Sequence, residues 1–240
     1  MISIIIPTYQ DAKYLIQTLK GILNQSYQNF ETIIVDDGLK EEARKKIEKY
    51  LEDKNKEKIK LIKQVPAGAP AARNKGFRQS SGDFLFFCDD DIILEKNVLG
   101  KMIEILNKHL DISYVYCDFY LDWKKFKSFN FNEERLKKMP YISAMSLIRR
   151  EHFPGWDESL KKFQDWDLWL TMLEKGHRGY HISEALFKAI PRKRGMSNWL
   201  PSFCYKIPWH IFPFKLFIPQ VIIKYEQGVK IIKEKHRLGK

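Results

Sequence analysis

Residues 84–91, Phe-Leu-Phe-Phe-Cys-Asp-Asp-Asp, constrain the fold more than any other stretch of this chain. The apolar run predicts a buried strand, and it ends in three consecutive carboxylates. Because side chains alternate along a strand, we expect Asp89 and Asp91 to point one way and Asp90 the other. Such close like charges repel unless a cation lies among them, and Mg²⁺ or Mn²⁺ prefers oxygen ligands together with substrate phosphates. The run therefore predicts a metal site for a phosphorylated ligand. The alternative is that Asp91 only caps a helix starting near Leu94.

Strands and helices alternate through the first half of the chain. The predicted strands are 2–6, 31–35, 60–65 and 84–88, and the predicted helices are 12–23 (with Asp11 as N-cap), 41–51, 70–79 and 94–110. This order favours a mostly parallel central sheet flanked by helices, an α/β fold. Such sheets bind ligands at the carboxyl ends of their strands. Polar clusters stand at three of these ends: Thr8-Tyr9, Asp36-Asp37-Gly38 and Asp89–Asp91.

The second half is mixed. Strands are expected at 113–123, 142–149 and 179–188, a helix at 165–174, and an amphipathic helix at 219–235. The net charge of +12 is concentrated after residue 191, where eleven Lys or Arg face two Glu. Three widely spaced cysteines suggest a reducing compartment. The sequence shows neither a signal peptide nor a long apolar span, so we expect a cytoplasmic protein. This expectation includes peripheral binding to the cytoplasmic face of a membrane.

Three further motifs each have a functional and a structural interpretation. Asp37, in an Asp-Gly pair after a strand, could accept a hydrogen bond from a ligand or only form a turn. Arg73, at the start of an Ala-rich helix, could bind phosphate or be a surface cation. The segment from Gly155 to Trp169 could form a sugar platform from Trp and Asp side chains, or Asp165 could simply be an N-cap. No GxGxxG or GxxxxGK[ST] motif is present.

The order of these motifs resembles family-2 glycosyltransferases of the GT-A fold over about residues 1–190. The matching segments are Ile6–Gln10, Val35–Gly38, Ala72–Gly76, Gly82–Asp91, Ser143–Arg149, Trp156–Glu158 and Gln164–Trp169. The resemblance implies a GT-A-type nucleotide-diphospho-sugar transferase fold. Residues 1–110 would be its nucleotide-binding half and 111–190 its acceptor half, followed by a basic aromatic extension over 191–240.

The resemblance also implies roles for single residues. Nucleotide-binding residues would be Pro7, Thr8, Tyr9, Asp37, Arg73 and Asp90, with Tyr9 beside the base and Asp37 accepting from a base N–H. The metal, Mn²⁺ or Mg²⁺, would be held by Asp89 and Asp91. Asp165 would be the catalytic base, and Trp156, Asp157 and Trp166 would bind the acceptor.

The resemblance implies an inverting, metal-dependent transfer of a sugar from a nucleotide-diphosphate sugar. UDP is the expected nucleotide. The acceptor would be a hydroxyl of a glycan or lipid-linked acceptor in cell-envelope polysaccharide synthesis. The sequence departs from the family at Gln10, Leu39 and Gln164, and it lacks the family's frequent His after the last strand. Lys193 or Arg194 could neutralise the diphosphate instead.

The tail interleaves lysines with aromatic residues, which are Trp199, Phe203, Tyr205, Trp209, Phe212, Phe214 and Phe217. This composition suits an anionic membrane surface, with the helix from residue 219 in the headgroup plane. Alternatively, the tail packs on the catalytic domain. Two other functions stay open: a catalytically silent nucleotide-sugar-binding protein and a nucleic-acid binder. The second is disfavoured because acidic clusters at the strand ends would repel phosphate, so we expect no nucleic-acid partner.

Overall fold

The computed structural model describes residues 1–52, 58–191 and 218–239. The strands are β1 (Ile2–Gln10), β2 (Phe30–Leu39), β3 (Ile59–Lys63), β4 (Phe84–Phe87), β5 (Ile92–Leu94), β6 (Tyr114–Leu121), β7 (Lys124–Phe126), β8 (Leu147–Arg149) and β9 (Gly179–Ala189). The helices are α1 (Leu15–Leu23), α2 (Glu41–Glu52), α3 (Ala69–Arg78), α4 (Val98–Lys108), α5 (Glu133–Lys138), α6 (Gln164–Glu174) and α7 (Gln220–Lys235), with a 3-10 turn, η2, at Arg150–His152.

Within the described residues the strands form one sheet in the order β3-β2-β1-β4-β8-β6-β9-β5, and β7 pairs with β6. The neighbours β3, β2, β1 and β4 are parallel, whereas β8 is antiparallel to both β4 and β6. The expected mostly parallel α/β sheet is confirmed for the first four strands. The predicted halves, 1–110 and 111–190, share this sheet, and their division into domains stays a prediction.

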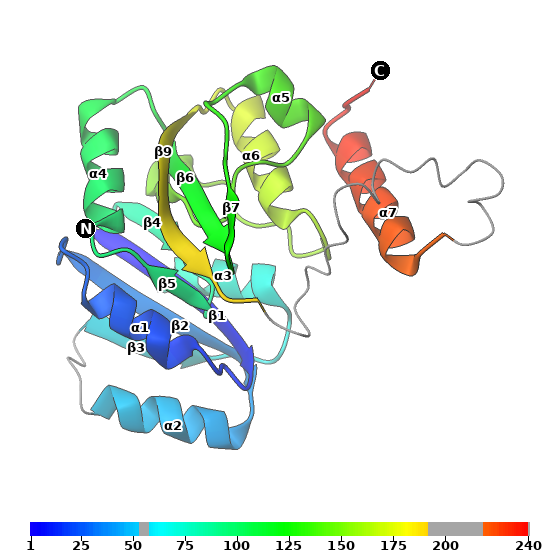
Figure 1. The fold of residues 1–240 in the computed structure, drawn as a ribbon. Coiled ribbons are helices and arrows are strands. Elements are labelled where there is room, and N and C mark those ends of the chain that lie inside the picture. The colour runs from blue at the N-terminus through cyan, green and yellow to red at the C-terminus, as the bar shows by residue number, and fades with distance from the viewer. Residues whose placement is uncertain (53–57, 192–217, 240) are drawn as a thin grey trace.

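Each face of the sheet packs against its own set of helices. Along β1, Ile2, Ile4 and Ile6 join a core with α1, α2 and α4, whereas Ile5 joins a second core with α5, α6 and α7. This alternation follows from the two-residue period of a strand, and burial on both faces explains the continuous apolar run. Figure 1 shows α5, α6 and α7 gathered at the end of the molecule away from α2.

Two predicted helices begin later than expected. Residues 92–94 form β5, antiparallel to β9, because Ile92 and Leu94 are buried in the first core. The following helix, α4, starts at Val98 after Asn97, so the structure contradicts the alternative that Asp91 caps a helix. Similarly, α1 begins at Leu15 after Tyr14 rather than after Asp11. Here the chain turns first, with positive φ at Gln10 and Ala12.

The second half differs from expectation in smaller ways. The strand predicted at 142–149 is confined to Leu147–Arg149, and α5 and β7 were not predicted. Both are short, since α5 has six residues and β7 has three, so their periodicity is weak. The helix predicted at 219–235 is confirmed as α7. The seven aromatic residues from Trp199 to Phe217 lie outside the described residues, as do Lys193 and Arg194.

The C-terminal helix α7 is fixed to α6 by apolar and charged contacts. Ile232 is fully buried in the second core, and Gly228 lies against the ring of Phe163. Lys235 bridges Asp157 at 2.6 Å and Asp167 at 2.7 Å. The ring nitrogens of His236 meet Asp167 and Glu174, each at 2.8 Å. The described part of the tail, α7, thus packs on the rest of the fold, whereas both alternatives for the aromatic residues stay predictions.

Gly76→Ala should destabilise the fold, because a Cβ at this position would overlap Cγ2 of Ile5, where α3 crosses β1. Overpacking of this kind costs about 1–3 kcal/mol. Gly100→Ala in α4 is the matched control, since its nearest contact would be Oγ of Ser26 at 3.4 Å. There, the better helix propensity of Ala should leave stability unchanged or raise it. Urea denaturation measures both variants, and equal free energies of unfolding would contradict the packing argument.

His236 should make the free energy of unfolding depend on pH. Burial lowers the pKa of His236, but its bonds to Asp167 and Glu174 outweigh that effect and hold the pKa above the ordinary value of 6.5. Stabilisation from such a group is complete below the unfolded-state pKa and disappears as pH rises through the folded-state pKa.

His236→Gln should therefore lower the free energy of unfolding more at pH ~5.5 than at pH ~9, as measured by urea denaturation. His109→Gln, at an exposed position, is the control and should show little difference between the two pH values. An equal loss of unfolding free energy for His236→Gln at both pH values would refute a stabilising contribution from charged His236.

Candidate functional site

The carboxyl ends of β1 and β4 are tied together by a hydrogen bond between two predicted site residues. Oγ1 of Thr8 donates to Oδ2 of Asp90 over 2.9 Å, and both side chains are buried. Pro7 precedes Thr8 in β1, beyond Ile5, the last residue of β1 that pairs with β4. Its missing N–H therefore interrupts no bond between these two strands. Thr8 and Asp90 are thus fixed relative to each other before any ligand binds.

Asp89 and Asp91 flank Asp90 in the loop between β4 and β5. Asp89 accepts a hydrogen bond from Nη2 of Arg73 at 2.8 Å, and its side chain remains 43% exposed. The carbonyl of Asp91 accepts from the backbone N–H of Ile190 at 2.9 Å. Burial raises the pKa of the Cys88 thiol, and the negative charges of Asp89, Asp91 and Asp90 raise it further. The loop therefore concentrates negative charge at the end of β4.

The chemistry of this loop fits a hard divalent cation. In the described part of the chain, no group of three or more His, Cys, Asp or Glu side chains is arranged to hold a metal. Mg²⁺ and Mn²⁺ at phosphate-binding sites need only one or two protein carboxylates, because phosphate oxygens and waters supply the other ligands. The exposed carboxylate of Asp89, next to Asp91, meets that requirement.

Asp36 and Asp37 have separate partners at the end of β2. Asp36 accepts from the backbone N–H groups of Gly38 and Leu39 and from Arg44, which shapes the turn before α2. Asp37 accepts from Nε2 of Gln64 and from the N–H of Ala67 at 2.7 Å each, and from the N–H of Gly68 at 2.9 Å. A carboxylate offers about four acceptor positions, so Asp37 retains capacity for a ligand N–H.

Tyr9 lies beside Asp37. Its side chain is 51% exposed, and the edge of its ring approaches Gly38 so closely that a Cβ there would lie 3.0 Å from Cε2. The same Cβ would lie 2.9 Å from Pro66, and Gly38 has φ +116°. Only glycine adopts this backbone conformation readily, which explains the Asp-Gly pair. Tyr9 and Pro66 therefore both lie against Gly38, the residue after Asp37.

Arg73, in α3, connects the two halves of the predicted site. Its guanidinium bonds Asp89, reaches Oε1 of Gln164 at 3.4 Å, and lies 4.8 Å from the ring centroid of Trp156. The residue is only 6% exposed. Its Nε is buried, and the described residues offer it no hydrogen-bond acceptor. An unpaired buried donor in a cationic group is a feature expected of an anion-binding site.

Asp165 lies in the first turn of α6, next to the Arg73 partner Gln164. Burial raises the pKa of Asp165, and Asp89 raises it too, whereas the N–H of Trp166 and the charge of Arg73 oppose this shift. Phe163, the residue before α6, adopts the left-handed conformation at φ 57° and ψ 30°. Such strain in a bulky residue persists only where surrounding contacts enforce it. Here the contacts come from α7, through Gly228 and Tyr225.

The structure does not support a sugar platform made of Trp156 and Trp166. Their side chains are 4% and 1% exposed, and Nε1 of Trp166 donates to the carbonyl of Leu136 at 2.7 Å. Both rings belong to the second core. They pack there rather than face a ligand because burying a large aromatic ring is strongly favourable. Asp157 is partly exposed but paired with Lys235, and this contact lowers its pKa to about 2.

Several residues that shape the site were assigned no role from the sequence. The carboxamide of Asn74 bonds the backbone N–H and carbonyl of Trp156 and the carboxylate of Glu158, all within 2.9 Å. Gln64 supports Asp37, and Gln164 meets Arg73. Asn74 follows Arg73 directly, so its position on the same buried turn of α3 was the available signal.

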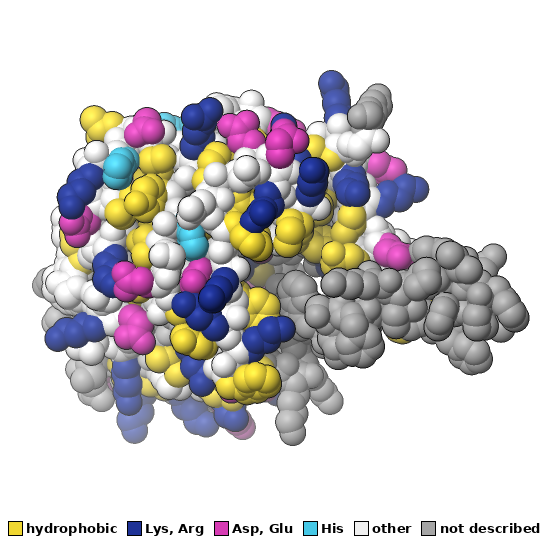
Figure 2. Space-filling model, turned by 45° about the horizontal axis from the view of Figure 1, so that its top comes forward, with side chains coloured by type: hydrophobic (Ala, Val, Ile, Leu, Met, Phe, Trp, Pro, Cys, Tyr) yellow, Lys and Arg dark blue, Asp and Glu magenta, His cyan; other side chains and the backbone are white. Residues whose placement is uncertain are grey.

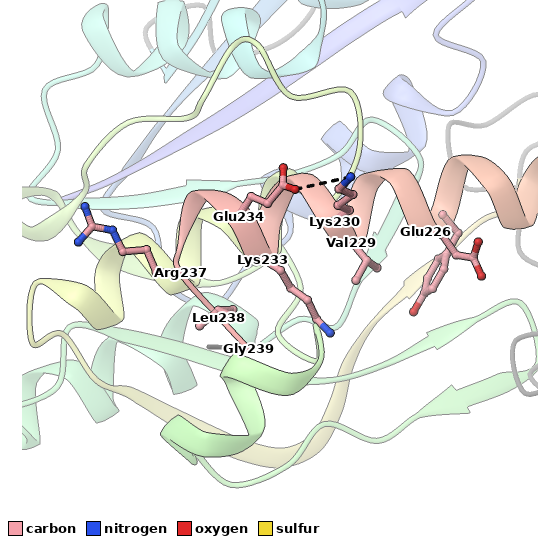
Figure 3. A pocket seen from close by; sticks show the side chains of 9 residues that line it. Glu226, Val229, Lys230, Lys233, Glu234, Arg237, Leu238 and Gly239 are labelled. Atoms are coloured by element: carbon pink, nitrogen blue, oxygen red, sulfur yellow. Dashed lines mark ion pairs between the residues drawn. The ribbon is translucent and has the colours of Figure 1, made fainter.

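The concave surface along α7 lies apart from these carboxylates. A groove of about 660 Å³ is lined by Tyr225, Glu226, Val229, Lys230, Lys233, Glu234, Arg237, Leu238 and Gly239. Figure 3 shows the ion pair of Lys230 with Glu234 on this helix. In the parts of the chain that are described, no helix is both long and apolar enough to cross a bilayer.

This chain is similar in sequence to known glycosyltransferases. The profile of Glycosyl transferase family 2 matches residues 3–155. An uncharacterised glycosyltransferase of Haemophilus influenzae is 36% identical over 122 residues, which cover 49% of this chain and 48% of that protein. A provisionally assigned teichuronic acid biosynthesis glycosyltransferase of Bacillus subtilis, TuaG, is 24% identical over 88% of this chain and 87% of its own length. The chain thus spans only about half of the Haemophilus relative.

Two solved structures show the same fold. The crystal structure of S. aureus TarS 1–349 with UDP-GlcNAc has a TM-score of 0.70 at 20% identity, over 98% of this chain and 72% of that one. The mannosyltransferase PcManGT from Pyrobaculum calidifontis, with GDP-Man and Mn²⁺, has a TM-score of 0.66 at 17% identity, over 81% and 58%. Together with the family profile, which covers more than half of the chain, they establish that this protein belongs to glycosyl transferase family 2 and has the GT-A fold.

Proposed function

We propose that this protein is an inverting glycosyltransferase that moves a sugar from a nucleotide-diphosphate donor to a hydroxyl of an acceptor glycan or lipid-linked glycan. The observation that carries this proposal is the meeting of three groups from different elements. Arg73 of α3 bonds Asp89 at the end of β4 and lies within electrostatic range of Asp165 in α6. An anion-binding cation, a metal-binding carboxylate and a candidate base are thereby gathered at one edge of the sheet.

The donor nucleotide is assigned to the ends of β1, β2 and β4. The base would lie beside Tyr9, with Asp37 accepting from a ring N–H, and Asp90 near the ribose. The buried, unpaired Nε of Arg73 is a donor suited to a phosphate oxygen. Asp89 and Asp91 would hold a divalent cation, which, when bound, offsets negative charge on the departing nucleoside diphosphate.

Asp165 is assigned as the base. A carboxyl whose pKa is raised is a better proton acceptor than an ordinary aspartate, provided that it stays ionised at the working pH. Asp165 takes the proton of the acceptor hydroxyl while that oxygen bonds the anomeric carbon. The bond from the anomeric carbon to the diphosphate oxygen breaks, and its electrons leave with the nucleotide. Attack opposite the leaving group inverts the configuration at this carbon.

The substrate class is supported by the relatives. TarS was crystallised with UDP and with UDP-GlcNAc, and PcManGT with GDP-Man, so related folds accept nucleotide-linked sugars. The name of TuaG places it in synthesis of teichuronic acid. For this chain we favour a UDP-sugar donor and a cell-envelope glycan acceptor. A peripheral contact with the cytoplasmic membrane surface, through the basic tail, is part of the same proposal.

Calorimetric titration with UDP, with and without Mn²⁺, tests the donor site. The wild type should bind UDP more tightly with Mn²⁺, and Asp91→Asn should abolish the metal-dependent gain because one carboxylate ligand is lost. Asp111→Asn, at an exposed position after α4, is the matched control. Asp165→Asn should keep UDP binding but lose about 10²–10⁴-fold in transfer rate. If UDP, GDP and dTDP all fail to bind the wild type, the proposed donor site is wrong.

The electrostatic link between Arg73 and Asp165 is tested by carboxyl ¹³C NMR, with Asp165 assigned through Asp165→Asn. The midpoint of Asp165 should lie above the ordinary aspartate value, because burial disfavours the charged form. Arg73→Met should raise this midpoint further, since the positive charge that favours the carboxylate is removed. Arg78→Met, exposed at the end of the same helix, should leave it in place. An unchanged titration midpoint of Asp165 in Arg73→Met would show that the charge of Arg73 does not act on Asp165.

A further inference from the structure

The hairpin between β6 and β7 presents an exposed tryptophan at its tip. Leu121 pairs with Lys124, so Asp122 and Trp123 form a two-residue turn. Asp122 has φ 56°, a left-handed conformation that Asp tolerates better than most residues. The side chain of Trp123 is 83% exposed, whereas Trp156, Trp166 and Trp169 are at most 4% exposed. The Trp123 ring is therefore open to solvent at a turn held by the pairing of β6 with β7.

The turn lies next to the loop that carries the candidate metal ligands. Leu121 pairs with Ala189 of β9, and the N–H of Asp122 donates to the carbonyl of Ala189 at 3.1 Å. On the other side of β9, Ala189 pairs with Ile92, the residue after Asp91. Two strand spacings, about 10 Å, therefore separate the start of the turn from the end of the acidic loop. Trp123 thus belongs to the rim of the proposed catalytic site.

Cations and a second aromatic ring lie on the hairpin that carries Trp123 and on the adjoining strand β9. Tyr120 is 39% exposed and lies opposite both Lys125 and Lys188 in the sheet register. Lys125 is 3.4 Å from Asp118 and Lys188 is 3.9 Å from Asp122, which fixes their stems near the hairpin. We call Tyr120, Trp123, Lys125 and Lys188 the hairpin patch. Figure 2 shows hydrophobic and basic side chains interleaved on the face that it displays.

We propose that Trp123 is an acceptor-binding residue, whose indole face stacks on a sugar ring of the acceptor glycan. This inference rests on the proposed function. Aromatic faces pack against the apolar C–H faces of sugars, and the neighbouring lysines favour glycans that carry carboxylates or phosphates. The hairpin patch thereby takes the role that the sequence assigned to Trp156 and Trp166, which are buried.

Position favours a glycan over other occupants. Single exposed apolar residues are common on protein surfaces and by themselves indicate nothing. Trp123, however, is linked through two backbone hydrogen bonds, from Asp122 to Ala189 and from Ile190 to Asp91, to the loop where the donor phosphates are expected. An acceptor chain entering the site from the β9 side would cross this turn. A membrane surface is the competing occupant, and the experiment separates the two.

The test uses the full-length protein labelled with 5-fluorotryptophan, with the Trp123 resonance assigned by Trp123→Phe. The labelled protein is titrated with chitotetraose, a neutral tetrasaccharide, and with a hyaluronan tetrasaccharide, an anionic one. Mixed phosphatidylcholine and phosphatidylglycerol vesicles form the third arm. A saturable shift of the Trp123 resonance with either oligosaccharide is expected. No shift with either one, or a response to vesicles alone, overturns the inference.

A second measurement separates binding from structure. The oligosaccharide that shifts Trp123 serves as acceptor, and Trp123→Ala should raise its KM about tenfold with little change in kcat, because stacking is made equally in ground and transition states. Trp123→Phe should restore most of the affinity. Leu110→Ala, a similarly exposed position before the start of β6, should leave both constants unchanged. A fall in kcat with constant KM would also overturn the inference.

The donor site is monitored in the same samples. UDP and Mn²⁺ should bind Trp123→Ala as tightly as the wild type, because Trp123 makes no part of the proposed nucleotide site. If the wild type binds UDP but the Trp123 resonance does not shift with either oligosaccharide, only the acceptor-binding role of Trp123 is refuted. Loss of UDP binding in the wild type refutes the proposed function itself, so the two failures are distinguishable.

Discussion

The crowding of carboxylates at one edge of the sheet is the constraint on which the rest of this structure depends. Each is balanced locally: Asp36 by Arg44, Asp37 by two backbone N–H groups and Gln64, Asp89 by Arg73, and Asp90 by Thr8. Without such partners, buried or partly buried negative charges would be strongly unfavourable. The turns that follow β1, β2 and β4 owe their shapes to these bonds. These bonds fix the carboxylates of the candidate site within the fold itself.

Arg73 connects that edge to the second half of the molecule. Its helix α3 lies close against the sheet because Gly76 and small neighbours such as Ala72 allow it. From there the guanidinium spans Asp89 and Gln164 while stacking near Trp156. Asn74, one residue on, fixes the backbone of Trp156. Two adjacent residues of one helix therefore set the distance between the donor side and the candidate base.

Local pattern explains what the sequence predicted well. The first four strands and most helices follow from apolar periodicity, and the acidic strand ends follow from the preference of parallel sheets for ligands there. The errors arise where long-range contacts override local pattern. The helix expected from Leu94 starts only at Val98, because Leu94 belongs to a strand that pairs with a segment nearly one hundred residues later. Trp156 and Trp166 carry the aromatic character of a sugar platform, yet exposure depends on packing that no motif encodes. Trp123 was passed over because a single Trp in a turn has no sequence signature.

The pairing of β5 with β9 also determines the order in which the site can assemble during synthesis. The N–H of Ile190, the residue after β9, donates to the carbonyl of Asp91, so the acidic loop is tethered to a segment made about one hundred residues later. A nascent chain that has reached α4 can already pair β1, β2, β3 and β4, whose contacts are local by comparison. Its candidate metal-binding loop, however, still lacks the hydrogen bond from Ile190. During synthesis, β1 to β4 can therefore pair before the candidate metal-binding loop gains its contact with the residue after β9.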